Sequence, residues 1–98
     1  MTNKDFLKTL SLEKTRLEHE LVAATEKADG LDDKETLAWA AVVPMEHAPE
    51  DDYTREQCEA IYDAYEQAMR ASEEQADYVE EIENTIEKIK SLMEMYED

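Results

Sequence analysis

Few residues in this sequence have the types and spacing that chemistry requires. The only histidines are His19 and His47, and the only cysteine is Cys58. His47 lies beside an acidic run at residues 50–52, but the spacing lacks the Asp-x-Asp-x-Asp-Gly pattern of a calcium loop. His19 has no second histidine four residues away, which a zinc-protease helix requires. We therefore expect no metal site.

Covalent or acid–base catalysis finds little support either. A catalytic cysteine needs a neighbouring base, and no pattern places one beside Cys58, for which we expect a buried and inert thiol. A single glycine excludes a glycine-rich phosphate loop. The carboxylates are too numerous to nominate one catalytic pair. We expect that the chain is not an enzyme and uses no cofactor.

The acids themselves are the informative residues. The 98 residues carry a net charge of −17. Residues 1–30 contain six acids and five bases, whereas residues 31–98 contain 21 acids and five bases. Such asymmetry indicates a region with an electrostatic role. It excludes direct binding to nucleic acid, which needs cations to replace phosphate counterions, and anionic membranes would repel the chain. A basic protein surface is the predicted partner.

The elements that position these acids are predicted to be helices in one domain, residues 1–98. Only one Gly and two Pro occur, and strong helix formers are abundant. The sequence predicts an all-α fold, a small helical bundle or coiled coil. Two N-terminal helices are expected at about residues 4–28 and 33–43, and one long or gently bent helix at about 55–96.

Local signals set these boundaries. Gly30 is the expected C-cap of the first helix, and Asp32 with Glu35 forms a capping-box-like pair for the second. Pro44 is expected to stop or kink that helix, and residues 44–53 to form a loop. Trp39 lies in the nearly all-apolar segment 37–43, which we expect the other helices to surround, with Trp39 as a core anchor.

The long helix carries a heptad repeat if Cys58 takes position a. Its a and d positions are apolar except in a polar layer at Ser72 and Gln75. This layer is compatible with a bend or a change of packing partner, but no Gly or Pro forces a break, which favours one long or gently bent helix. The most apolar part of this seam is Val79, Ile82, Ile86, Ile89 and Met93. We expect the first helix to cover part of it and a second copy of the chain, in a homodimer, to cover the rest.

Position b of the same heptad is glutamate in every repeat, and positions c and f add further acids. Repulsive pairs four residues apart, such as Glu73–Asp77, destabilise a helix, which favours a functional face over a merely solubilising one. The predicted partner-binding residues are Glu50, Asp51, Asp52, Glu59, Asp63, Glu66, Glu73, Glu74, Asp77, Glu80 and Glu81.

The spacing of these acids suggests what they bind. Successive carboxylates advance roughly 5–6 Å along a helix. Phosphates of one DNA strand advance about 3.4 Å axially per nucleotide and are spaced somewhat wider along the backbone itself. A rigid row of carboxylates at this scale can therefore occupy a groove built for phosphates. In size, charge and helicity, without a shared motif, the chain resembles DNA-mimic inhibitors. These are small acidic proteins with which phages and mobile elements block restriction enzymes, CRISPR effectors, glycosylases or nucleases. The resemblance implies an inhibitor of a nucleic-acid-binding protein.

Two alternatives remain. One is a coiled-coil assembly protein whose acidic surface only keeps it in solution. The other is an antitoxin or immunity protein that caps a basic toxin.

We also expect a cytoplasmic location. The polar start Met1–Asp5 lacks the features of a signal peptide. The longest apolar run, residues 37–43, is far shorter than the ~20 residues of a membrane helix. A single cysteine suits a reducing compartment.

Overall fold

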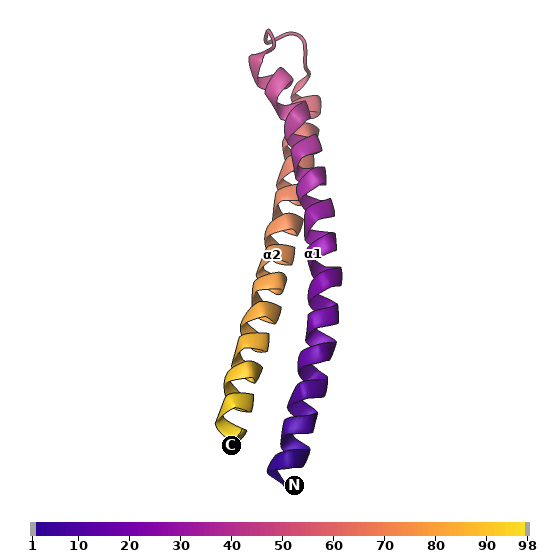
Figure 1. Cartoon of the computed structure of the whole chain (residues 1–98). Helices are drawn as coiled ribbons and strands as arrows, with labels where there is room; N and C mark the ends of the chain where they lie inside the picture. Colours follow the sequence, from indigo (N-terminus) through magenta and orange to yellow (C-terminus); the bar gives the residue numbers. More distant parts are fainter. Residues whose placement is uncertain (1, 98) are drawn as a thin grey trace.

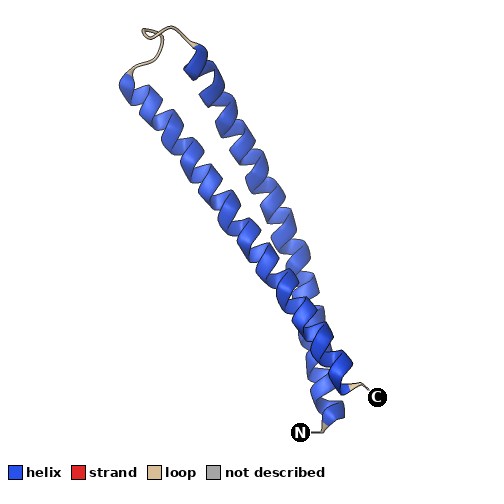
Figure 2. Cartoon of the chain, turned by 90° about the vertical axis from the view of Figure 1, so that its left-hand side faces the viewer, coloured by secondary structure: helices blue, strands red, loops and turns tan. Residues whose placement is uncertain are grey.

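The computed structural model describes residues 2–97, which form an antiparallel hairpin of two long helices (Figure 1). Helix α1 spans Asn3–His47 and helix α2 spans Arg55–Tyr96, and a short loop joins them. The molecule is a rod of 73 × 17 × 16 Å. The start of α1 and the end of α2 lie together at the end opposite the loop (Figure 2). The prediction of an all-α, coiled-coil-like fold is confirmed.

The N-terminal half is one helix, so the predicted break between helices at 4–28 and 33–43 is wrong. No glycine or other described residue has a positive φ, so Gly30 is an ordinary helical residue and not a left-handed cap. A glycine inside a helix costs only about 1 kcal/mol, and continuous packing against α2 offsets that cost. Asp32 likewise lies inside α1, where its carboxylate accepts a hydrogen bond from the Ser72 hydroxyl of α2.

Pro44 lies inside α1, which continues for three more residues to His47. The predicted loop at 44–53 is correspondingly shorter and occupies residues 48–54. Two contacts hold the last turn of α1 after the proline. Met45 is buried, and Glu46 accepts a hydrogen bond of 2.9 Å from the Tyr62 hydroxyl on α2.

The prediction for α2 is confirmed at both ends. Its N-cap is Thr54, which forms a full capping box with Gln57: the Thr54 hydroxyl accepts from the Gln57 backbone N–H at 3.1 Å, and the Gln57 side chain accepts from the Thr54 N–H at 2.8 Å. The helix then runs unbroken through the polar layer. At Ser72 and Gln75 the packing partner does not change, because both side chains are buried and bonded to α1.

The core is a single seam between the helices. Its centre is Ala24 packed with Ile82 and Ile86, and Val42 near the loop is fully buried. The covered positions of α1 recur at intervals of three and four residues along its whole length, which matches the repeat of α2. They are Leu7, Leu10, Lys14, Leu17, Leu21, Ala24, Ala28, Leu31, Glu35, Ala38, Val42 and Met45, and Phe6 next to Leu7 is also half-buried.

Trp39 is not a core anchor, because 45% of its surface is exposed. With one partner helix, only the stripe containing Ala38 and Val42 can face α2. The flanking residues of the apolar segment are left outside, so Leu37 is 72% exposed and Val43 is 39% exposed. The expectation that other helices surround this segment is therefore wrong.

Candidate protein-binding surface

All of the predicted partner-binding acids are exposed. Three of them, Glu50, Asp51 and Asp52, lie in the loop at the hairpin end, where the Asp52 backbone N–H donates to the Pro49 carbonyl at 3.0 Å. The others lie on α2, on positions that point away from the seam. We call these the acidic face: Glu59, Asp63, Glu66, Glu73, Glu74, Asp77, Glu80 and Glu81.

Little of the acidic face is neutralised. Among the described residues, every ion pair joins two residues three or four positions apart on the same helix. Only two of these pairs involve the acidic face: Glu59 with Arg55 at 3.2 Å and Glu66 with Arg70 at 4.0 Å. From Glu73 to Glu81, no acid of the face is in an ion pair within residues 2–97.

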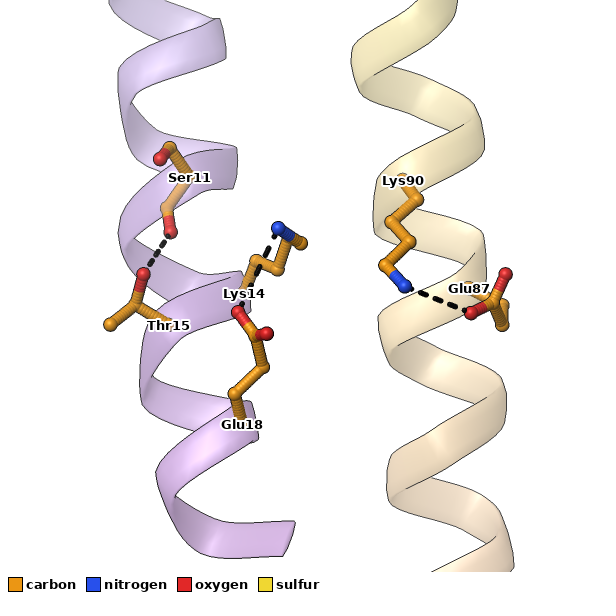
Figure 3. Close-up of polar contacts among 6 residues, drawn as sticks. All are labelled: Ser11, Lys14, Thr15, Glu18, Glu87 and Lys90. Atoms are coloured by element: carbon orange, nitrogen blue, oxygen red, sulfur yellow. Dashed lines mark hydrogen bonds and ion pairs between the residues drawn. The ribbon is translucent and has the colours of Figure 1, made fainter.

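The bases of the chain are concentrated elsewhere. Helix α1 contains ten acids and six bases, whereas α2 contains twelve acids and four bases. Toward the terminal end of the rod each helix pairs its own charges, Lys14 with Glu18 at 3.7 Å and Lys90 with Glu87 at 3.2 Å (Figure 3). Negative charge is therefore least compensated on the middle of α2 and in the loop.

Two acids of α1, Glu20 and Glu46, instead accept hydrogen bonds that link the two helices. The hydroxyl of Tyr78 donates to the Glu20 carboxylate at 3.0 Å, as the hydroxyl of Tyr62 does to Glu46. Each hydrogen bond to a carboxylate raises the pKa of its tyrosine above the usual value, since it favours the protonated phenol. These two tyrosines lie beside the seam and join the edges of the two helices.

The apolar seam residues lie in the core of one chain. Ile82, Ile86 and Ile89 are buried, and Val79 and Met93 are half-buried. Because α1 extends along the full length of α2, it covers the part of the seam for which a second copy was expected. The apolar content of this seam therefore gives no reason for a homodimer.

A second feature, near the loop, was not predicted from the sequence. Glu35 and Thr36 of α1 line a shallow notch together with Trp39 and with Tyr65 of α2. The rings of Trp39 and Tyr65 are tilted by 52° with centroids 5.0 Å apart. The sequence signal that could have indicated this notch is the continuous heptad repeat of α1, because that repeat assigns Glu35 to a seam position.

Within residues 2–97, no group of three or more His, Cys, Asp or Glu side chains is arranged to hold a metal ion. Neither described helix has a stretch both apolar and long enough to cross a bilayer. Cys58 is a half-buried free thiol at the seam.

Comparison with protein-family models, with curated proteins and with solved structures gave no match.

Proposed function

We propose that this chain is a binding protein whose acidic face occupies a basic surface of a nucleic-acid-binding protein. In this role the chain is an inhibitor: its carboxylates occupy the basic surface that would otherwise bind the phosphates of nucleic acid. The single observation that carries the proposal is the run of exposed acids without an ion pair from Glu73 to Glu81, within the described residues, on one continuous helix.

Such a run of like charges weakens the isolated protein. Like charges three or four residues apart on a helix each cost a few tenths of a kcal/mol. A small domain has only about 5–15 kcal/mol of total stability, so uncompensated repulsion over several turns is a substantial loss. A cationic groove would relieve it and would also steer the encounter.

The geometry supports a groove rather than a single pocket. The acids are held on a rigid helix in a rod 17 Å across, and the loop acids extend the charge to the rod's end. A linear array at fixed spacing suits a protein surface that follows a phosphate backbone. No catalytic chemistry is required for this role.

The test compares two variants of equal charge change. One replaces Glu73, Asp77 and Glu80 with Gln, Asn and Gln. The control makes the equivalent changes on α1 at Glu26, Asp29 and Asp33, which are also exposed and outside every ion pair of the described residues. Each protein is immobilised and used to capture binders from lysate at low salt.

We expect wild type and the α1 control to retain a nucleic-acid-binding protein that the α2 variant loses, and added duplex DNA to release it. Equal capture by all three proteins would mean that the acidic face only aids solubility. The identity of the captured protein separates a nuclease, restriction, CRISPR or repair target from a basic toxin, for which the recognition physics is the same.

A second candidate, an assembly protein, is favoured by a different observation. The outer side of α1 exposes large apolar side chains: Leu12 is 64%, Val22 is 61% and Leu37 is 72% exposed. Such residues on the less acidic helix could pack against another helix. Sedimentation velocity of wild type and of a Leu12→Gln, Leu37→Gln variant tests this role. An oligomer formed by wild type and lost in the variant supports it. If both proteins sediment as monomers, the assembly role is excluded.

A further inference from the structure

The notch described above lies about two turns before the end of α1, at the loop end of the rod. Its lining combines two aromatic rings, Trp39 and Tyr65, with the carboxylate of Glu35 and the hydroxyl-bearing side chain of Thr36. Glu35 and Trp39 are four residues apart on one helix, so they are neighbours on its surface. The notch thus presents a negative charge next to aromatic faces.

Glu35 is an unusual residue for its position. It takes a seam position of α1 and is half-buried there. Among the described residues it takes part in neither an ion pair nor a side-chain hydrogen bond. A partly desolvated carboxylate gains more from a cation than an exposed one does, because the surrounding dielectric is lower. This chain supplies no such cation from residues 2–97.

Trp39 is the second unusual residue. It is the only tryptophan of the chain, and 45% of its surface is exposed. The neighbouring Ala38, by contrast, is half-buried in the seam. The Tyr65 ring lies beside the indole at a tilt, and close to half of the Trp39 surface stays exposed. Tryptophan has the strongest attraction for cations among the aromatic side chains and is enriched among the residues that dominate interface energies.

We propose that this notch receives an arginine side chain of the basic partner. The guanidinium stacks on the exposed indole of Trp39 and donates to the Glu35 carboxylate. Arginine fits better than lysine, because its planar group can stack and donate in two directions at once, whereas an ammonium is a compact and strongly hydrated charge. This inference rests on the proposed function, since it assumes a basic partner, and it adds an anchor point to the acidic face.

The experiment uses the whole chain and a hexa-arginine peptide as probe, with hexa-lysine as the alternative cation. Calorimetry measures total binding, and the emission of Trp39 reports binding at the notch. Glu35→Gln is the test variant and Glu26→Gln is its control, because both remove one charge from α1 and Glu26 is exposed and far from the notch. Circular dichroism establishes that each variant is folded.

We expect hexa-arginine to change the Trp39 emission in a saturable manner and more strongly than hexa-lysine. The Glu35→Gln change should weaken hexa-arginine binding by about three- to tenfold, through the lost ion pair, and Glu26→Gln should weaken it much less. If the peptide binds without changing the emission, or if the two variants are equally weakened, the notch proposal is wrong while charge recognition survives. If neither peptide binds wild type at all, the proposed function itself fails.

Discussion

The side-chain amide of Gln75 donates a hydrogen bond of 3.0 Å to the backbone carbonyl oxygen of Ala24, across the hairpin. Both residues are buried, at 9% and 3% exposure. A buried polar side chain in a coiled-coil seam favours the one alignment in which it finds a partner. This pair therefore fixes how far α2 is shifted along α1.

Replacing Gln75 with leucine should separate alignment from stability. The Ala24 carbonyl lies within α1, where it also accepts a backbone hydrogen bond of the helix. Removing the Gln75 amide therefore leaves no buried polar group unpaired, and leucine adds apolar burial. We expect the free energy of unfolding to hold or rise by about 1 kcal/mol. Spin labels at positions 12 and 91, with Cys58 changed to serine, should give a broader distance distribution than in the parent. An unchanged distribution would show that the apolar seam alone sets the alignment.

The Gly30→Ala substitution distinguishes one N-terminal helix from two. Gly30 has no positive φ, and an added Cβ would have no neighbour within 4 Å. Alanine should raise the free energy of unfolding by about 1 kcal/mol, through its higher helix propensity and the lower entropy of the unfolded chain. The reverse change at the exposed Ala23 should cost a similar amount. Destabilisation by Gly30→Ala in chemical denaturation would mean that a helix ends at this residue.

Two adjacent valines provide a test of packing near Pro44. Val42 is fully buried and Val43 is 39% exposed. The Val42→Ala change should lower the free energy of unfolding by about 1–3 kcal/mol through lost burial and the cavity left behind. The Val43→Ala change should be neutral within about 0.5 kcal/mol. Equal effects in thermal or chemical unfolding would contradict the continuation of the α1 seam to Met45.

Salt should stabilise the wild-type protein. The net charge is −17, and the described ion pairs are few and mostly exposed, so screening relieves more repulsion than attraction. The thermal midpoint should rise between about 0.01 M and about 1 M sodium chloride. The Glu73, Asp77, Glu80 variant should start from a higher midpoint at low salt and gain less. A midpoint that falls with salt would show that attractive pairs dominate.

High pH should weaken the contacts between helix edges. The pKa of Tyr62 and that of Tyr78 are raised above the ordinary 10.0, mainly by the hydrogen bonds to Glu46 and Glu20. A group with a raised pKa in the folded chain contributes its stability below the unfolded pKa and loses it as pH rises through the folded value. Wild type should therefore lose more stability between about pH 9 and about pH 12 than a Tyr62→Phe, Tyr78→Phe variant. Parallel losses would mean that these hydroxyls contribute nothing.

The sequence predicted α2 well because its heptad repeat extends over residues 55–96 and no Gly or Pro interrupts it. It failed for α1 because Gly30 and Pro44 are strong local signals, whereas the continuous seam from Leu7 to Met45 is a long-range one. Tertiary packing offset the local penalties. The acidic face was predictable because position b needs no knowledge of the partner helix. The notch was not, because it depends on Tyr65 of α2 meeting Trp39 of α1, and this requires the alignment of the hairpin.

The sequence distance between bonded partners grows steadily from the loop to the open end. It is 16 residues for Tyr62 and Glu46, 40 for Ser72 and Asp32, and 58 for Tyr78 and Glu20. The entropy of closing a chain segment rises with its length, and local contacts form fastest. The hairpin should therefore fold as a zipper that closes from the loop. Amide hydrogen exchange should be slowest along the middle seam, and the contact between Phe6 and Tyr96 should be the last to close and the first to open.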